Sequence, residues 1–235
     1  MPGIMELLNS LFFPLMAGHL VADFWLQPSG WIACKRQNGW KSKKLIVHAL
    51  IASVVPVLFT LRPACWWLVP LIFGTHYLID LLKMKVRNSM LSFVADQFLH
   101  LAVLFALAGW AGEAEMSEKM VRGWIYACGF ILVTNPLGIL IGLFLKSVTQ
   151  AAGNSAKMDA SAWIGILERI LILIFIAAGQ FSAIGFLIAA KSIFRFNETK
   201  EGGNLKAEYF LLGTLASFAV AITVGLGINL LVGTK

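Results

Sequence analysis

The stretch that decides the fold is residues 19–100. Its ionisable pattern reads His19-x-x-x-Asp23, His48, His76-x-x-x-Asp80 and Asp96-x-x-x-His100. The stretch contains all four histidines of the chain and three of its four aspartates, and each His/Asp pair lies in an apolar run. A spacing of i, i+4 places both side chains on one face of an α-helix, about one turn apart. A charged side chain in a membrane helix costs about 2.5–3.5 kcal/mol on insertion scales, so these aspartates need partners. The pattern predicts a metal site inside a membrane helical bundle.

The composition is that of an integral membrane protein. Of the 235 residues, 59% are hydrophobic and 13% are charged, and the mean hydropathy is +0.80. A soluble domain carries roughly 25% charged residues, so the soluble globular class is excluded. The net charge of +7 does not indicate nucleic-acid binding, because most basic residues lie in short loops between apolar segments, where they set membrane topology.

Eight apolar segments predict an all-α, polytopic transmembrane bundle of about eight helices (7–8). The segments are roughly 4–26, 45–61, 63–83, 93–110, 122–145, 162–178, 180–196 and 209–232. Several approach the ~20 residues that span a bilayer. The sixth and seventh segments are either two helices, one broken segment or a re-entrant hairpin. We expect one integrated membrane domain, with a four-helix metal-site half at 1–110 and a C-terminal helical half at 111–235.

The distribution of Lys and Arg predicts an N-out, C-out orientation. The loops after the first, third, fifth and seventh segments hold fourteen of the nineteen basic residues and are therefore expected to be cytoplasmic. In that topology all seven ionisable residues of the quoted pattern fall in the cytoplasmic part of the first four helices. Neither the segment count nor the orientation used these residues, so their common depth independently supports one shared site.

The residue types indicate which metal the site would bind. The predicted ligands are His19, Asp23, His48, His76, Asp80, Asp96 and His100. Seven candidates exceed the four positions of a tetrahedral zinc site, so we expect one or two divalent ions, with some carboxylates orienting the histidines. Mixed imidazole and carboxylate ligation favours Zn, with Mn or Fe as alternatives. One of Asp23, Asp80 and Asp96 is expected to act catalytically, as a general base.

The motifs resemble a bacterial family of uncharacterised multi-pass membrane proteins, known mainly as a domain of unknown function. The similarity rests on Gly18-His19-Leu20-Val21-Ala22-Asp23-Phe24-Trp25-Leu26-Gln27, on Lys44 with His48, on His76-Tyr77-Leu78-Ile79-Asp80 with Lys83, and on Asp96-Gln97-Phe98-Leu99-His100. Residues 165–169, 191–192 and 208–214 resemble the longer members of that family. The resemblance implies a membrane protein and names no activity.

The first functional hypothesis is a metal-dependent hydrolase of the bacterial cytoplasmic (inner) membrane. It would act on a lipid or lipid phosphate near the cytoplasmic leaflet, because a bound metal can activate water and polarise a phosphoryl or carbonyl oxygen. Lys44, Lys83 and Arg169 are candidates for binding an anionic headgroup. The same basic residues also fit a topological role at the membrane surface.

Two alternatives come from other classes. A divalent-metal or proton transporter or channel uses relays of Asp and His inside a helical bundle. The outer halves of the first four segments are largely apolar, which favours a one-sided site over a transport path. In a structural membrane protein, the His–Asp pairs would only stabilise the bundle. Membrane lipid is the expected partner, nucleic acid is not, and a homo-oligomer is compatible with the sequence.

Overall fold

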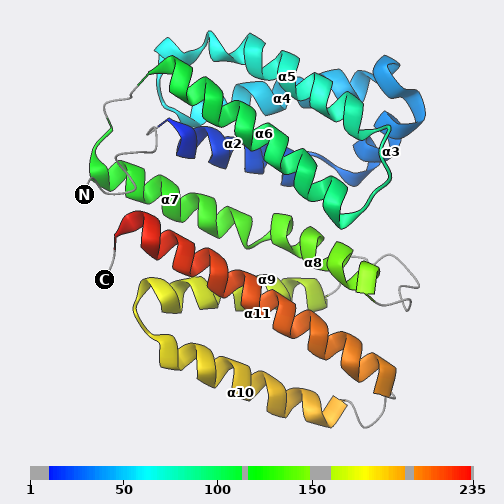
Figure 1. Ribbon diagram of the computed structural model, residues 1–235, viewed down its shortest axis with the longest axis vertical. Coiled ribbons are helices and arrows are strands. Elements are labelled where there is room, and N and C mark those ends of the chain that lie inside the picture. Colours follow the sequence, from blue (N-terminus) through cyan, green and yellow to red (C-terminus); the bar gives the residue numbers. More distant parts are fainter. Residues whose placement is uncertain (1–10, 113–115, 149–159, 199–203, 234–235) are drawn as a thin grey trace. The chain divides into compact units, whose positions relative to one another are not determined.

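The computed structural model describes residues 11–112, 116–148, 160–198 and 204–233, and all regular secondary structure in these ranges is helical. The expected all-α class is therefore confirmed for this part of the chain. The helices (Figure 1) are α2 (Phe12–Phe24), α3 (Ser29–Asn38), η1 (Gly39–Lys41), α4 (Lys43–Phe59), η2 (Pro63–Cys65), α5 (Leu68–Lys83), α6 (Met90–Ala111), α7 (Glu118–Leu132), α8 (Asn135–Val148), α9 (Ala160–Ala177), α10 (Phe181–Glu198) and α11 (Asn204–Val232). The chain divides into two compact units, Met1–Ile131 and Leu132–Lys235.

Fewer helices than expected are long enough to cross a membrane. Within the described ranges, three candidate spans are Met90–Ala111, Glu118–Val148 and Leu211–Val232, and a fourth is the bent pair Ser29–Lys41 with Lys43–Phe59. The expected count of eight is not confirmed. The reason is length: α4 and α5 contain 17 and 16 residues. At about 1.5 Å per residue, such helices extend ~25 Å, which is short of a hydrocarbon core of ~30 Å.

Four helices form the frame of the first unit. α2 packs against α4 and α6, and α5 packs against the same two helices, so the four enclose one interior. We call α2, α4, α5 and α6 the four-helix frame (Figure 1). α2 and α4 approach each other closely at Gly18, where a Cβ would lie 2.4 Å from the Cα of Pro56. Because that neighbour is backbone, only glycine allows this approach.

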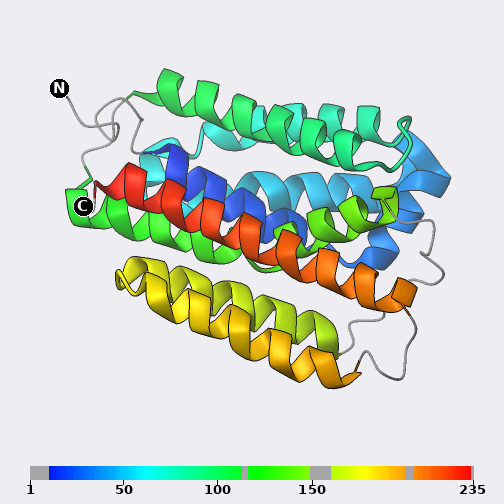
Figure 2. The same cartoon turned by 60° about the horizontal axis from the view of Figure 1, so that its bottom comes forward.

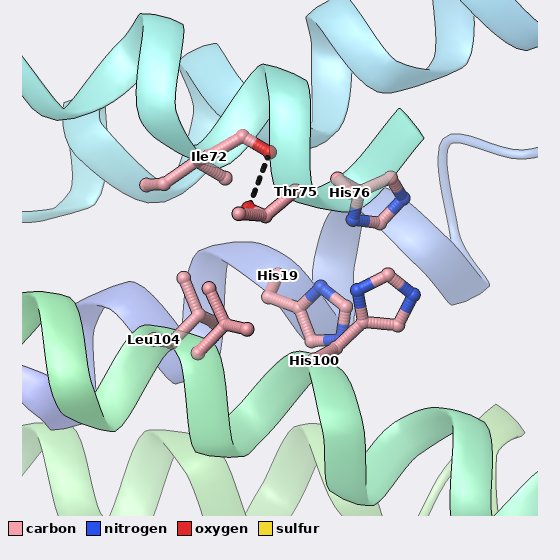
Figure 3. A pocket seen from close by; sticks show the side chains of 7 residues that line it. His19, Ile72, Thr75, His76, His100 and Leu104 are labelled. Carbon is pink, nitrogen blue, oxygen red and sulfur yellow. Dashed lines mark hydrogen bonds between the residues drawn. The ribbon is translucent and has the colours of Figure 1, made fainter. Parts of the chain in front are cut away.

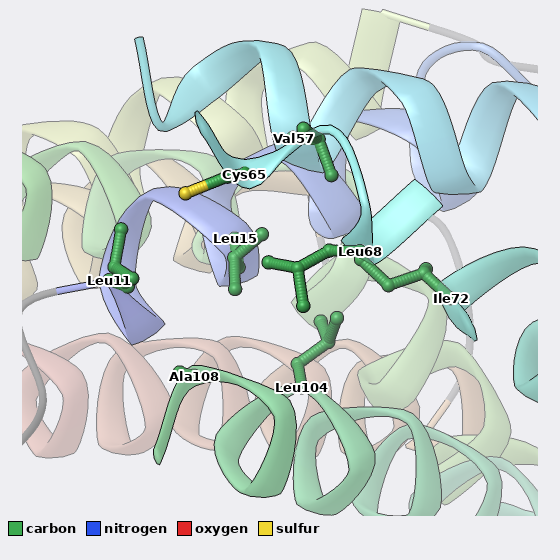
Figure 4. Close-up of a cluster of buried hydrophobic side chains, with 8 residues drawn as sticks. All are labelled: Leu11, Leu15, Val57, Cys65, Leu68, Ile72, Leu104 and Ala108. Carbon is green, nitrogen blue, oxygen red and sulfur yellow. The ribbon is translucent and has the colours of Figure 1, made fainter. Parts of the chain in front are cut away.

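The apolar part of this interior is a cluster of eight buried side chains (Figure 4). They are Leu11, Leu15, Val57, Cys65, Leu68, Ile72, Leu104 and Ala108. Leu15 and Ile72 precede His19 and His76 by four residues, and Leu104 follows His100 by four. Because four residues make about one helical turn, the histidines lie one turn beyond the apolar cluster on three helices.

The start of α6 is determined by a reciprocal cap. The Ser89 hydroxyl accepts a hydrogen bond from the backbone N–H of Ser92 at 3.1 Å, and the Ser92 hydroxyl accepts one from the N–H of Ser89 at 3.0 Å. Such a capping box satisfies two N–H groups that the first helical turn would leave free. The helix then runs for 22 residues, with Asp96 and His100 on its buried face.

The first unit, Met1–Ile131, also includes α7. The Cys128 thiol of α7 donates a hydrogen bond to the carbonyl of Phe13 at 3.2 Å. The rings of Trp124 and Phe59 lie 5.6 Å apart. These contacts attach α7 to α2 and α4, so the unit contains α7 and α3 in addition to the four helices that bear the His/Asp pattern.

The second unit consists of α8, α9, α10 and α11. α11 packs against α8 and α9, and α10 packs against α9 (Figure 2). The core contains Ile172, Ile176, Ile184, Phe218 and Ala221. α9 and α10 are two separate helices joined at Gly179, whose φ of +70° favours glycine. Residues 162–178 and 180–196 therefore form two helices and not one continuous segment.

Candidate metal centre

All seven predicted ligand residues lie together inside the four-helix frame. They are His19 and Asp23 on α2, His48 on α4, His76 and Asp80 on α5, and Asp96 and His100 on α6. None of their side chains is more than 11% exposed. The i, i+4 spacing turns both members of each pair inward, because each helix presents the same face to the interior. We call these seven residues the polar cluster.

The four histidine rings are in mutual contact, with His76 in the middle. Its ring centroid lies 4.2 Å from that of His100, 5.0 Å from that of His48 and 5.7 Å from that of His19. Figure 3 shows His19, His76 and His100 around a small cavity, whose volume is about 10 Å³. A cavity of this size is close to the lower limit for holding one water molecule.

Asp23 is the carboxylate that faces the histidines. Its Oδ1 atom lies 3.4 Å from Nε2 of His48, 3.6 Å from Nε2 of His76 and 3.7 Å from Nδ1 of His19. The Nε2 atoms of His48 and His76 are 3.1 Å apart. Within the described structure Oδ1 of Asp23 is buried and has no hydrogen-bond partner. A buried acceptor without a partner lowers the stability of the fold, and a ligand bound to this atom would remove that penalty.

Three of these atoms fit the corners of a tetrahedral zinc site. Zn–N and Zn–O distances of about 2.0–2.1 Å place two ligand atoms of a tetrahedron ~3.3–3.4 Å apart. The triangle of Asp23 Oδ1, His48 Nε2 and His76 Nε2 has sides of 3.1, 3.4 and 3.6 Å. We call these three residues the Asp23 triad. Three protein ligands and an open fourth position are typical of catalytic zinc, whereas structural zinc has four protein ligands.

Two lysines neutralise the other two carboxylates of the polar cluster. Lys35 of α3 donates a hydrogen bond to Oδ2 of Asp80 at 2.5 Å, and Lys83 donates one to Oδ2 of Asp96. Three carboxylates and two ammonium groups leave one negative charge, which belongs to Asp23. The described ion-pair contacts of Asp23 are all to imidazoles, so a proton or a metal ion must balance its charge.

Two further groups of side chains in the polar cluster have metal-like geometry. One is His19, His76 and His100, and the other is Asp80, Asp96 and His100. Within each group the ligand atoms lie within 4.8 Å of one another. Nε2 of His19, Nε2 of His100 and Oδ1 of Asp96 are buried and lack hydrogen-bond partners in the described structure. The donor set and these unpartnered atoms together fit at least one divalent metal.

Comparison with protein families identifies the segment that carries this cluster. A family model described as "Protein of unknown function (DUF3307)" matches residues 11–123. Residues 11–123 are thus similar to the DUF3307 family. The resemblance to an uncharacterised family is thereby confirmed. No curated protein and no solved structure matches the chain.

The DUF3307 segment contains the whole polar cluster and both lysines that neutralise it. It lies entirely within the first unit, Met1–Ile131. The stretches that resemble longer family members, at 165–169, 191–192 and 208–214, lie outside the matched residues. The family match therefore covers the candidate metal centre and leaves the second unit unassigned.

Two of the predicted substrate-binding residues belong to the DUF3307 segment. Lys83 is occupied by Asp96, as described above. Lys44 is exposed, and its ammonium lies 4.9 Å from the ring centroid of Trp31. Such cation–π pairs are common for lysines at a membrane surface, where the aromatic ring and the charge both meet the headgroups.

Arg169, the third of these candidates, belongs to the second unit. Its buried guanidinium donates hydrogen bonds to the carbonyls of Val133 and Thr134 and to the Ser217 hydroxyl. Residues 133 and 134 separate α7 from α8, just before Pro136. A proline removes a helical hydrogen bond and frees carbonyls of the preceding turn. Arg169 therefore has a structural role in the described structure.

Sequence reasoning did not single out Lys35, which it counted among the loop charges. The ammonium is buried and its partner Asp80 lies 45 residues away, so no local spacing indicates the contact. The Gln27 amide also lies against Lys35, and its oxygen accepts a hydrogen bond at 2.5 Å when it is turned toward the ammonium. Gln97 donates a hydrogen bond to Asp96 at 3.1 Å. Both amides thus support the lysine–carboxylate pairs.

Proposed function

We propose that the chain is a membrane-embedded, metal-dependent hydrolase whose divalent ion is held by the Asp23 triad. The observation that carries this proposal is the triangle of Asp23 Oδ1, His48 Nε2 and His76 Nε2, with sides of 3.1–3.6 Å. Two imidazoles and one carboxylate favour Zn, with Mn or Fe as alternatives. When bound, the metal supplies Lewis acidity, which activates a water and polarises a phosphoryl or carbonyl oxygen.

The remaining residues of the polar cluster have two roles in this proposal: His19 accepts a proton, and Asp80 and Asp96 contribute negative charge. His19 Nδ1 lies 3.7 Å from Asp23 Oδ1, while its Nε2 has no described partner and its ring lines the small cavity. An imidazole in that place can accept a proton from a water in the cavity, as a general base does. Asp80 and Asp96 each accept a hydrogen bond from a lysine, so in this arrangement they hold the lysines in place and do not accept the proton.

The substrate we propose is a lipid or lipid phosphate of the cytoplasmic leaflet. The three candidate spans support a membrane location. The Lys/Arg distribution supports an N-out, C-out orientation with about eight crossings in a bacterial inner membrane, and it places the polar cluster near the cytoplasmic side. A cavity of about 10 Å³ has room for one water molecule at most and none for a headgroup, so substrate entry requires the helices around it to open.

A proton relay is the second candidate function. It is favoured by the unbroken contact of the four histidine rings, with centroid separations of 4.2–5.7 Å. A relay would carry its proton charge on an imidazole next to Asp23, without a resident metal. The two functions therefore differ in whether an ion stays bound.

Metal content, measured by mass spectrometry on chain purified without a histidine tag, tests the proposal. We expect about one Zn, Mn or Fe per chain, retained through purification because the triad is buried. His76→Ala and Asp23→Asn should lose it, since each removes one of three ligands. Lys44→Met, which alters an exposed side chain, is the matched control and should keep the metal.

Wild-type protein that holds no Zn, Mn or Fe after incubation with each ion would rule out the hydrolase and leave the proton relay. Metal that stays bound in Asp23→Asn would contradict the assigned ligands. Metal held by the wild type and lost in both ligand variants would justify assays of hydrolysis on phospholipid and lipid-phosphate substrates.

A further inference from the structure

We propose that Asp80, Asp96 and His100, the Asp80 triad, form a second cation site, which a divalent ion occupies by displacing the ammonium of Lys83. This inference deepens the proposed metal-dependent function and rests on it. The ligand atoms of the three residues lie within 4.8 Å of one another. Oδ1 of Asp96 and Nε2 of His100 lie 3.7 Å apart, slightly more than the ~3.3 Å between two ligands of a tetrahedral ion, so these side chains must move inward when the ion binds.

Unpartnered atoms show that this site is built for a ligand. Oδ1 of Asp96 and Nε2 of His100 face each other at 3.7 Å. Both atoms are buried and neither has a hydrogen-bond partner in the described structure. The two side chains are 4% and 3% exposed, so bulk water does not satisfy them. A cation between the two atoms would satisfy both at once.

The lysines show that the site attracts positive charge. Asp80 and Asp96 each hold an ammonium group. Lys35 is only 5% exposed, whereas Lys83 is 31% exposed. The Lys83 side chain can therefore extend toward the membrane surface and release Asp96, as long basic side chains do at helix ends. Lys35 stays on Oδ2 of Asp80, so the ion would bind the other oxygen of that carboxylate.

The donor set selects a different ion from that of the Asp23 triad. The Asp80 triad offers two carboxylates and one imidazole, whereas the Asp23 triad offers one carboxylate and two imidazoles. Oxygen-rich sites suit Mn²⁺, and imidazole-rich sites suit Zn²⁺. We therefore expect Zn²⁺ in the first site and exchangeable Mn²⁺ in the second.

The test uses Lys83→Met and full-length chain in detergent, loaded with Zn²⁺ and titrated with Mn²⁺. Free Mn²⁺ is followed by electron paramagnetic resonance, and bound Zn²⁺ by mass spectrometry. We expect Lys83→Met to bind one Mn²⁺ roughly tenfold more tightly than the wild type, because no ammonium competes for Asp96. Lys44→Met should match the wild type. Adding His100→Ala to Lys83→Met should abolish the gain.

A second measurement covers the case in which Lys83→Met does not fold. Mn²⁺ is added to wild-type protein, and an amine-reactive label is quantified at each lysine by mass spectrometry. Labelling of Lys83 should rise with Mn²⁺ while labelling of Lys44 stays constant. Unchanged labelling of Lys83, or unchanged Mn²⁺ affinity in folded Lys83→Met, would overturn the second site. If that same protein still retains Zn²⁺, the second site alone is rejected and the Zn²⁺ site at the Asp23 triad stands.

Discussion

Three aspartates of the same pattern have different electrostatic surroundings. Asp80 and Asp96 each contact a lysine ammonium, and Asp23 contacts imidazoles. A buried carboxylate with an ammonium partner is compensated, whereas one without such a partner costs several kcal/mol. At the residue scale, Asp23 is therefore the buried carboxylate of this pattern whose negative charge has no ammonium partner in the metal-free protein. This is also the residue that a metal ion would relieve.

This difference predicts opposite effects of two identical substitutions. In metal-stripped protein, Asp23→Asn should leave the melting temperature unchanged or raise it, because it removes an uncompensated charge. Asp80→Asn should lower it, because it leaves the buried ammonium of Lys35 unpaired, which costs about 3–5 kcal/mol. Thermal unfolding in detergent, followed by tryptophan fluorescence, measures both. A larger loss in Asp23→Asn than in Asp80→Asn would contradict the charge assignment.

At the element scale, the Asp23 triad depends on how closely α2 and α4 approach. Asp23 and His48 lie on these two helices, and Gly18 is the residue that permits the approach. The metal geometry varies by only a few tenths of an ångström around its ideal value. A small separation of the two helices would therefore destroy the triangle while leaving each helix intact.

Gly18→Ala tests that dependence, with Gly74→Ala of α5 as the matched control. A Cβ on Gly18 would lie 2.4 Å from the Cα of Pro56, whereas a Cβ on Gly74 meets nothing within 4 Å. Overpacking of this kind costs about 1–3 kcal/mol. We expect Gly18→Ala to lose bound metal and melt at a lower temperature, and Gly74→Ala to keep both properties. Equal metal content in the two variants would show that the α2–α4 distance does not control the site.

The short helices raise a question at the scale of the whole molecule. α5 has 16 residues, yet the N-out, C-out orientation requires it to cross the membrane. Local bilayer thinning and flanking basic residues allow short helices to span, at a modest energetic cost. α5 is therefore the helix on which the proposed eight crossings can best be tested.

Single cysteines at the two ends of α5 provide the test, in a background without Cys34, Cys65 and Cys128. Arg62→Cys should react with an impermeant maleimide in intact cells, and Arg87→Cys only after the membrane is opened. That result would establish that α5 crosses the membrane and that the loop after it is cytoplasmic. Both cysteines reacting from the same side would reject the crossing and the eight-helix topology.

Much of the fold and of the site could be predicted from local patterns. Apart from α3 and η1, which lie in the basic loop after the first segment, the helices occupy the expected apolar segments, because apolar runs form helices wherever water is excluded. The count of membrane crossings could not be confirmed from the same pattern, because the ends of α4 and α5 are set by η1, η2 and the turns beside them. Hydropathy alone does not predict where α4 and α5 begin and end.

The sequence by itself determined the all-helical architecture with helices apolar enough to span a membrane, and the seven residues of the polar cluster. These follow from composition and from the i, i+4 geometry of a helix, which are local properties. Only the tertiary structure decided that Lys35 and Lys83 neutralise Asp80 and Asp96 and leave Asp23 to the histidines. The lysines lie 45 and 13 residues from their partners, so the contacts depend on how the helices pack. Charge compensation acts over a few ångströms in space, and sequence spacing does not report such distances.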